Sequence, residues 1–481
     1  MKHLSKPELF RQRAYVDGVW IESHADFPVL NPATGETLGR VPKLARAEVS
    51  RAIAAADAAL PAWRGLPARE RAAVLRRWHG LMLQHADDLA RIITLEQGKP
   101  LTEAHGEVLY AAGFLEWFGE EAKRVYGAVI PSPWPERRIV TLKQAIGVAA
   151  LITPWNFPAA MLTRKAGAAL AAGCTVLAKP AAKTPFTALA LAYLAELAGV
   201  PPGVLNVLTG DAETIGDEFM RDARVRKLSF TGSTETGKRL MAACAATLKS
   251  VSLELGGNAP FIVFDDADLD AAVAGALASK YRNAGQTCVC ANRLMVQDGI
   301  HDAFVEKLAA AVSRLHVGNG LDVGVEQGPL VNAAAVAKVE RYIREAVALG
   351  ARVACGGARH ALGGGFFQPT VLANASADMQ ICRSETFGPV APVIRFQTEA
   401  EAIRLANDTE YGLAAYFYTR DSARTWRVAE ALEYGMVGIN AGVISSEVAP
   451  FGGVKQSGLG REGGAVGIEA YLETKYLCMT V

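Results

Sequence analysis

A short stretch of the sequence, residues 282 to 293 (RNAGQTCVCANR), holds Cys288 and Cys290 one residue apart. A thiolate is a strong nucleophile, and a nearby cation, which Arg282 could supply, lowers the pKa of a thiol. The spacing is too tight for a metal clip, and no other Cys or His pair has ligand spacing, so we expect no metal. The stretch favours a nucleophilic Cys288, while a disulfide or plain burial of both cysteines stays open.

Two further stretches supply groups that a nucleophile needs. Glu254 lies among apolar residues in LELGGN (253–258), and such surroundings raise the pKa of a carboxyl group toward that of a general base. Asn156 follows an apolar run in ITPWNFP (152–158), and its side-chain amide can donate to an oxyanion. Alone, each has a structural alternative: Glu254 could bond to backbone amides, and Asn156 could cap a helix.

The stretch FTGSTETGK (230–238) follows a predicted strand and leads into a predicted helix. Its glycines allow a ligand to approach the backbone, and the start of a helix attracts anions. The stretch matches neither the usual dinucleotide fingerprint nor a P-loop, so an ordinary turn capped by Ser and Thr is an equal alternative.

These stretches lie on alternating strands and helices. Amphipathic helices are predicted within 45–95, and short apolar runs alternate with helical segments from about 145, which indicates a parallel sheet covered on both faces. A second αβ region begins near 255. Residues 125–144 instead read as a projecting β-hairpin, and the strand-like C-terminal tail could join it in one accessory sheet.

Composition excludes several classes of protein. The 481 residues are 51% hydrophobic and 21% charged, which indicates two or more globular lobes. The 50 Lys and Arg residues balance the 49 Asp and Glu residues, so we expect no nucleic acid or membrane as partner. Without a secretory signal, a membrane span or a disulfide framework among seven cysteines, the expected location is cytoplasmic.

Taken together, the motifs resemble the aldehyde dehydrogenase superfamily over nearly the whole chain. The series is TPWNFP, KPA, FTGSTETGK, LELGGN, GQTCVC, ETFGPV and PFGGVKQSGLGREGG. The resemblance implies an α/β fold with a Rossmann-type cofactor lobe (1–124 and 145–253), an α/β catalytic lobe (254–445) and a small β oligomerisation element (125–144 and 465–481). It also implies a homo-oligomer, either a dimer or a tetramer.

The resemblance assigns the chemistry residue by residue. Cys288 looks like the nucleophile that forms a thiohemiacetal and then a thioester, Asn156 and the Cys288 amide look like the oxyanion hole, and Glu254 looks like the base that activates water. A non-catalytic binding protein on the same fold is the alternative from another class, and a thioester hydrolase or CoA-acylating enzyme is a further one.

The resemblance also implies a nicotinamide cofactor. The positions that resemble its cleft are Thr153, Trp155, Asn156, Lys179, Ala182, Lys183, Gly232, Ser233, Leu255, Glu385 and Phe387. NAD-preferring relatives often carry a Glu three residues after the equivalent of Lys179, and here Ala182 takes that place, with Lys183 beside it. We therefore expect NADP as the preferred cofactor, with NAD possible.

The substrate clue is a resemblance to the branch of the superfamily that oxidises succinate semialdehyde. The positions that match its carboxylate-binding residues are Arg164, Arg282 and Ser446, with Ser445 as the neighbour. Guanidinium groups pair with carboxylates through parallel hydrogen bonds, so an aldehyde with a distal carboxylate is the expected substrate. Glutarate semialdehyde, one methylene longer, and a purely structural role for the arginines stay open. Cys290 matches a redox partner of Cys288 in that branch.

Overall fold

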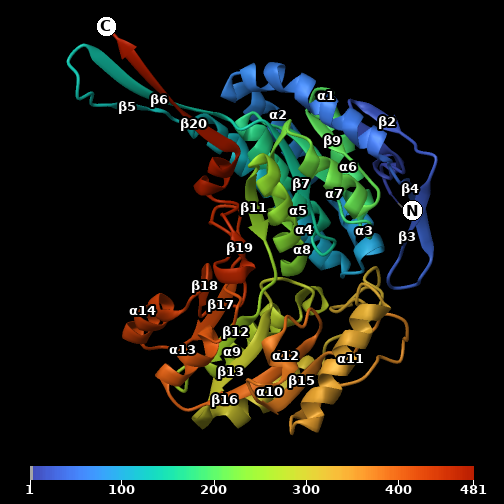
Figure 1. Ribbon diagram of the computed structural model, residues 1–481. Coiled ribbons are helices and arrows are strands. Elements are labelled where there is room, and N and C mark those ends of the chain that lie inside the picture. The colour runs from blue at the N-terminus through green and yellow to red at the C-terminus, as the bar shows by residue number, and fades with distance from the viewer. Residues whose placement is uncertain (1–3) are drawn as a thin grey trace.

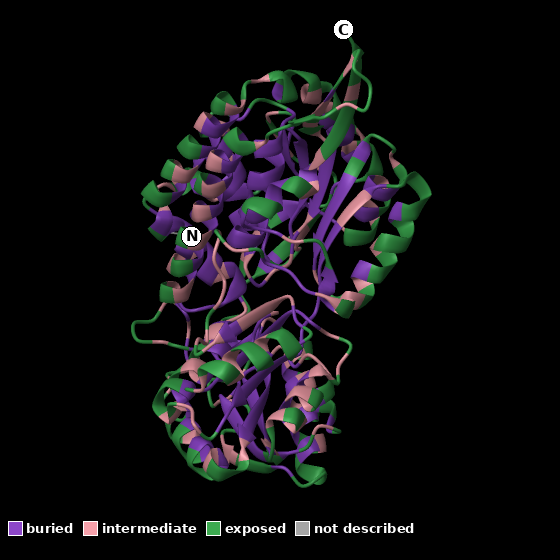
Figure 2. Cartoon of the chain, turned by 90° about the vertical axis from the view of Figure 1, so that its left-hand side faces the viewer, coloured by how far each residue is buried: buried purple, intermediate pink, exposed green. Residues whose placement is uncertain are grey.

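The computed structural model describes residues 4–481. Two α/β lobes lie one above the other, and a narrow β arm projects from the upper lobe (Figure 1). In each lobe the strands are mostly buried, and the exposed residues gather on the covering helices (Figure 2). No helix within residues 4–481 has the length and apolar character needed to cross a membrane.

The upper lobe is built on an eight-stranded sheet in the order β19-β11-β10-β7-β8-β9-β1-β2. Its five central strands are parallel: β7 (Val148–Ile152), β8 (Thr175–Lys179), β9 (Leu205–Val207), β10 (Val225–Thr231) and β11 (Ser250–Glu254). The parallel sheet was predicted from the first four of these strands, and β11 was not predicted as a strand. Antiparallel strands complete its edges, namely β1 (Ala14–Val16), β2 (Val19–Ile21) and β19 (Gly458–Leu459). The edges were not foreseen, because very short strands carry little periodic signal.

Helices cover both faces of this sheet. They are α1 (Arg46–Gly65), α2 (Ala68–Gln84), α3 (Ala86–Gln97), α4 (Leu101–Glu121), α5 (Pro158–Ala172), α6 (Pro185–Leu197), α7 (Ala212–Arg221) and α8 (Thr234–Cys244). Every residue of α5 is buried, including Arg164 and Lys165. Long charged side chains are almost never fully buried unless they are paired, so both cations must find anions inside the lobe.

The lower lobe contains a seven-stranded sheet in the order β14-β15-β16-β13-β12-β17-β18. The strands are β12 (Ala259–Val263), β13 (Ala291–Gln297), β14 (Arg352–Cys355), β15 (Thr370–Ala375), β16 (Val390–Phe396), β17 (Ala414–Tyr418) and β18 (Met436–Ile439), and all pair in parallel except β14. Its helices are α9 (Leu269–Lys280), α10 (His301–Val312), α11 (Ala333–Ala348), α12 (Gln380–Arg383), α13 (Glu399–Asn407) and α14 (Ser422–Ala431).

The projecting arm is a three-stranded antiparallel sheet of β5 (Ala128–Ile130), β6 (Arg137–Ala145) and β20 (Leu472–Thr480). Leu472 lies opposite Ala145, so the C-terminal tail pairs with a hairpin more than 300 residues earlier in the chain. Val129, Tyr476 and Met479 are exposed on it. A separate two-stranded sheet, β3 (Asp26–Leu30) and β4 (Thr37–Pro42), lies near the N-terminus.

The fold gathers the motifs at one edge of the upper sheet. Asn156 follows β7, Lys179 ends β8, Gly232 follows β10 and Glu254 ends β11. Because neighbouring parallel strands present their carboxyl ends at the same edge, these residues share one rim, where ligands of such sheets bind. The chain then crosses from Glu254 into the lower lobe.

Candidate functional site

Cys288 lies in the loop between α9 and β13, and the preceding turn has an unusual backbone. Asn283, Ala284 and Gly285 are all left-handed, with φ of 52°, 53° and 72°. A Cβ at Gly285 would lie 2.2 Å from the carbonyl oxygen of Gly388, so only glycine fits there. Consecutive left-handed residues cost free energy and persist where surrounding contacts impose them. The turn directs Cys288 to the junction of the two lobes.

Two cavities meet at Cys288. One, of about 310 Å³, extends from Cys288 between α4, α5 and the loop that holds Ser445. The other, of about 270 Å³, extends from Cys288 along the rim of the upper sheet. A thiol that borders both cavities can react with a molecule in the first while a second molecule occupies the other.

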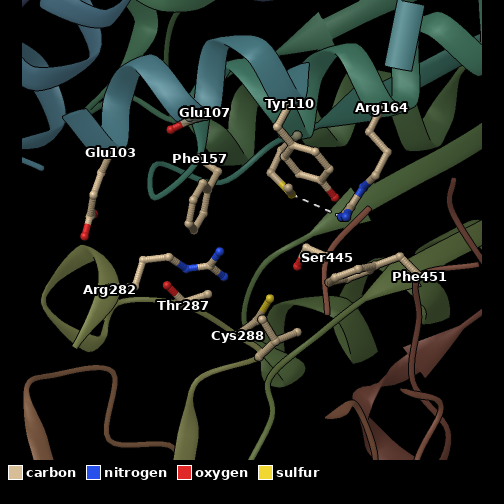
Figure 3. Close-up of a pocket in the computed structure, with 13 residues that line it drawn as sticks. Glu103, Glu107, Tyr110, Phe157, Arg164, Arg282, Thr287, Cys288, Ser445 and Phe451 are labelled. Atoms are coloured by element: carbon tan, nitrogen blue, oxygen red, sulfur yellow. Dashed lines mark hydrogen bonds between the residues drawn. The ribbon is translucent and has the colours of Figure 1, made fainter. Parts of the chain in front are cut away.

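The first cavity has apolar walls and a cationic lining (Figure 3). Phe157, Met161 and Phe451 supply apolar surface, and Arg164 and Arg282 supply two guanidinium groups. Glu103 and Glu107 also line the cavity, but Glu107 is paired with Lys99, and burial raises the pKa of Glu103. Figure 3 shows the hydroxyl of Tyr110 directed toward the Arg164 guanidinium. Two like charges on one small cavity favour an anion there.

The Arg164 guanidinium is held from behind by an anion. Its Nε lies 2.8 Å from Oε2 of Glu462, and its Nη2 lies 3.1 Å from the sulfur of Met161. Its Nη1 is buried and has no hydrogen-bond partner within residues 4–481, and the same is true of Nε of Arg282. Arg164 therefore forms a structural salt bridge, which was one of the two roles considered for it, and it also lines the cavity.

The two serine candidates have different surroundings. Ser445 lines the first cavity beside Cys288 and Arg282. The Ser446 hydroxyl instead lies 3.5 Å from the carboxylate of Glu447, and Ser446 is not among the residues that line the cavity. Of the two, Ser445, the neighbour considered for a one-residue slip, is the one placed to meet a ligand.

The thiol of Cys288 is not activated by its surroundings here. Burial raises its pKa to about 12, and the carboxyl groups of Glu385 and Glu254 add to the rise. The cation of Arg164 opposes the rise but does not overcome it. Cys288 is only half-buried, yet partial removal of the sulfur from water outweighs the charge, so its pKa is raised where a nearby cation was expected to lower it.

Glu254 is buried, and neither carboxyl oxygen has a hydrogen-bond partner within the described residues. Burial raises its pKa well above the ordinary value, as predicted, and the nearby Glu462 carboxylate raises it further. Arg164 and Lys165 work in the opposite direction. Lys165 pairs with Glu462, and the hydroxyl of Ser229 donates to Glu462 at 2.9 Å. Burial and the Glu462 carboxylate thus make the ionised form of Glu254 a stronger base than an exposed carboxylate.

Asn156 lines the second cavity, close to Cys288. Its amide nitrogen donates to the carbonyl oxygen of Gln286 at 3.0 Å, which ties it to the cysteine loop. An amide nitrogen carries two N–H groups, so one stays available to a ligand. The alternative role as a helix cap is not seen, since the residue before α5 is Phe157 and the first free amides of α5 donate to Glu107 and not to Asn156.

Seven of the predicted cofactor residues line the second cavity: Trp155, Asn156, Gly232, Ser233, Leu255, Glu385 and Phe387. The side chain of Ser233 caps α8, whose start therefore opens on this cavity. Glu385 accepts a hydrogen bond from the Gly257 amide at 3.2 Å, and burial raises its pKa to about 7. A helix start for phosphates and a buried carboxylate for ribose hydroxyls fit a nicotinamide dinucleotide.

The remaining four cofactor candidates lie beyond the lining of this cavity: Thr153, Lys179, Ala182 and Lys183. Thr153 pairs through its backbone with Lys179 across β7 and β8. Lys179 donates to the carbonyl of Pro180, and burial lowers its pKa to about 8. The ammonium of Lys183 lies 5.6 Å from the centre of the Trp155 ring, which places a cation next to the cavity wall.

Sequence reasoning missed four residues of the site: Tyr110, Lys165, Lys338 and Glu462. Lys338 donates to the Glu385 carbonyl at 2.7 Å, and the other three surround Arg164 or Glu254. Glu462 lies inside the motif PFGGVKQSGLGREGG and Lys165 adjoins Arg164, so both could have been noticed, whereas Tyr110 and Lys338 belong to no stretch whose local pattern predicts chemistry. Within residues 4–481 no cluster of three or more His, Cys, Asp or Glu side chains could hold a metal ion.

Comparisons with known proteins agree with this geometry. The sequence model of the Aldehyde dehydrogenase family matches residues 20–477. The chain is 65% identical over 478 residues to glutarate-semialdehyde dehydrogenase of Pseudomonas aeruginosa, covering 99% of both chains. It is 63% identical over 478 residues to the succinate-semialdehyde dehydrogenase (NADP(+)) of Escherichia coli, again covering 99% of both.

A solved structure has the same fold. The crystal structure of succinate-semialdehyde dehydrogenase from Burkholderia pseudomallei superposes with a TM-score of 0.99 at 62% identity. The match covers 99% of this chain and 100% of the other. The two-lobed α/β architecture predicted from the sequence is therefore confirmed.

The raised pKa of Cys288 predicts how the cofactor-free protein reacts with iodoacetamide. Because only the thiolate reacts, the alkylation rate should climb about tenfold per pH unit from pH 7 and reach no plateau below about pH 10. Peptide mass spectrometry separates Cys288 from the exposed Cys478. A plateau below pH 8 would show that the thiol is already ionised and that burial does not dominate.

Proposed function

The chain belongs to the aldehyde dehydrogenase family, and from this we propose that it oxidises succinate semialdehyde to succinate with a nicotinamide dinucleotide. The observation that carries the proposal is the cavity that begins at Cys288 and is lined by Arg164 and Arg282. A semialdehyde carries an aldehyde at one end and a carboxylate at the other, which matches a nucleophile and two guanidinium groups on one small cavity.

The unpartnered guanidinium donors of the two arginines support a substrate with a negative charge. Nη1 of Arg164 and Nε of Arg282 are buried donors without partners among the described residues, and such groups gain free energy when an acceptor arrives. The Phe157, Met161 and Phe451 walls suit the short methylene chain between the two ends. Ser445 adds a hydroxyl for the carboxylate, and Ser446 contributes no wall to this cavity.

We assign the first chemical step to Cys288 and Asn156. The Cys288 thiol gives up its proton to water, the thiolate sulfur attacks the aldehyde carbon, the C=O double bond opens, and negative charge builds on the oxygen. The free N–H of Asn156 and the backbone amide of Cys288 donate to that oxygen. Donors fixed in a site without water stabilise such charge strongly, and loss of one such donor typically slows catalysis by about 10² to 10³ fold.

The second half of the reaction belongs to Glu254. A nicotinamide dinucleotide held by Glu385, Phe387 and the start of α8 would supply the acceptor for the hydride of the former aldehyde carbon. The thioester that remains on Cys288 is then hydrolysed: Glu254 takes a proton from water, the oxygen attacks the acyl carbon, and the thiolate leaves with succinate released. A carboxyl group whose pKa is raised by burial and by Glu462 is suited to accept that proton.

Glutarate semialdehyde is the second candidate substrate, because the relative from Pseudomonas aeruginosa that carries its name is 65% identical. It differs by one methylene, which a hydrophobic pocket discriminates by only about 1 to 3 kcal/mol. Both substrates place a carboxylate at the far end, so the role of the arginines is common to both.

We further propose NADP as the preferred cofactor. Ala182 leaves no carboxylate to repel a 2′-phosphate, and Lys183 places a cation beside Trp155.

The exposed apolar side chains of the β arm support its use in pairing with further copies of the chain as a dimer or tetramer, which sedimentation velocity can measure. The cytoplasmic location stays a prediction, and cell fractionation with an antibody would test it.

The substrate proposal predicts a selective defect in Arg282→Ala. KM for succinate semialdehyde should rise by at least about tenfold, the effect of losing a charged hydrogen bond, while KM for an uncharged aldehyde of equal length should barely change. NADPH formation measures both, and Cys288→Ala, which should be inactive with either aldehyde, serves as the blank. Equal effects on the two aldehydes would rule out carboxylate recognition.

The cofactor proposal predicts that kcat/KM for NADP exceeds that for NAD. In Lys183→Ala the ratio should fall by about tenfold, because a cation near a phosphate contributes roughly 1 to 2 kcal/mol. Lys338→Ala, on the nicotinamide side of the cavity, is the matched control and should affect both cofactors alike. A wild-type preference for NAD would contradict the proposal.

Cys290 is buried one residue beyond Val289, and we propose it as the redox partner of Cys288. Peroxide would take two electrons and two protons from the thiols, forming a disulfide and water. Wild type should then lose activity and regain it with dithiothreitol. Cys290→Ala should be inactivated without full recovery, since a lone thiol oxidises further. If both proteins recover equally, there is no such switch.

A further inference from the structure

A buried ion pair that the proposed chemistry does not use lies at the wall of the first cavity, which Glu107 lines and Lys99 does not. Nζ of Lys99 lies 2.5 Å from Oε2 of Glu107, and both side chains are fully buried. Lys99 follows α3, and Glu107 lies in the second turn of α4. Burying two charges costs free energy that their attraction recovers only with excellent geometry, so the pair is weak evidence for a purely stabilising role.

Both members of the pair hold the segment that carries Asn156. Nζ of Lys99 donates to the backbone carbonyl of Asn156 at 2.8 Å. Oε1 of Glu107 accepts from the amides of Ala159 at 2.9 Å and Ala160 at 3.3 Å, the first free amides of α5. The ammonium of Lys99 also lies 3.8 Å from the centre of the Phe157 ring. The pair therefore fixes the backbone on both sides of residue 157, immediately after Asn156.

The same carbonyl is also bonded to the cysteine loop. Nδ2 of Asn283, in the left-handed turn before Cys288, donates to the Asn156 carbonyl at 3.1 Å. Nδ2 of Asn283 and Nδ2 of Asn156 both donate to the carbonyl of Gln286, at 3.2 and 3.0 Å. One carbonyl, that of Asn156, is thus the point where Lys99 and the cysteine loop meet.

Asn283 is itself held by the region around Lys99. Its Oδ1 accepts from the Gln97 side chain at 2.9 Å, and its backbone amide donates to Glu103 at 2.9 Å. Gln97 in turn accepts from the backbone amide of Lys99 at 2.9 Å. Residues at the junction of α3 and α4 therefore form hydrogen bonds both to the left-handed turn before Cys288 and to the loop that carries Asn156.

We propose that Lys99, together with Glu107, is a positioning residue that sets the distance between the Asn156 amide and the sulfur of Cys288. This inference rests on the proposed oxyanion role of Asn156. Lys99 lines neither cavity and reaches the oxyanion site through the Asn156 carbonyl, whereas its partner Glu107 also lines the first cavity. A shift of about 1 Å in a catalytic group can cost about 10² fold in rate, so loss of one anchor should be visible in the acylation step.

The test compares two reactions of Cys288. In Lys99→Met the burst rate of NADPH formation, which reports acylation, should fall by about tenfold to a hundredfold, while KM for succinate semialdehyde changes by less than about threefold. Alkylation of Cys288 by iodoacetamide develops no oxyanion, so its rate should stay near that of wild type. Equal losses in both reactions would overturn the proposal, because the Cys288 thiol itself would then be displaced. An unchanged burst rate would also overturn it, because Lys99 would then position no catalytic group.

A double-mutant cycle shows whether Lys99 acts through Asn156. In the Asn156→Ala background, Lys99→Met should change the burst rate by less than about twofold, since the group that it positions is gone. If the two losses multiply, Lys99 acts elsewhere and the inference fails. If Asn156→Ala alone leaves the burst unchanged, the proposed oxyanion role fails instead, so the two failures are distinguishable.

The chain offers a matched control and a second variant. Glu96 is also a buried carboxylate that accepts from the first amides of a helix, those of Phe186 at 2.8 Å and Thr187 at 2.9 Å in α6, but its partners all lie in α6. Glu107→Gln should reproduce the loss of burst rate even if Lys99→Met does not fold. Glu96→Gln should lower only the melting temperature. An equal burst defect in Glu96→Gln would show that loss of stability explains both.

Discussion

The site depends on one buried contact, between the Arg164 guanidinium on α5 and the Glu462 carboxylate on the segment after β19. Without Glu462, the α5 cations Arg164 and Lys165 would lie inside the upper lobe without a buried anion, and isolated buried charges are very costly. With Glu462, Lys165 is neutralised and Arg164 is held by Nε, which leaves Nη1 for the cavity. The same anion raises the pKa of Glu254. A single carboxylate therefore affects both ends of the proposed chemistry.

That contact explains why the end of the chain returns to the upper lobe. Gly458 pairs with Glu254 across β19 and β11, and a Cβ at Gly458 would lie 1.9 Å from the Leu253 carbonyl. The glycine therefore permits the close strand approach that brings Glu462 under α5. Residues from the two lobes thus enclose Cys288, which accounts for the burial that raises the pKa of its thiol.

Much of the architecture could be predicted from the sequence. The parallel strands β7, β8, β9 and β10 of the upper sheet and the strands β12, β13, β17 and β18 begin and end near the apolar runs, because buried parallel strands are continuous apolar segments between Pro, Gly and polar residues. The edge strands β1, β2 and β19 were missed, since their formation depends on a partner far along the chain. Local pattern therefore predicted the central layers and not their borders.

For the site, the sequence alone determined the chemical types: a thiol in Gly-Gln-Thr-Cys, a carboxyl among apolar residues, an amide after a strand and two arginines. These are local, because residue type and neighbours decide them. Tertiary structure decided everything that depends on distance and on exclusion from water. It chose Ser445 over Ser446 as cavity lining, raised the pKa of Cys288 where a cation suggested the reverse, and joined Lys99 and Asn283 at the Asn156 carbonyl. The physical reason is that burial and Coulomb energies depend on where the chain brings distant residues together, which no local stretch encodes.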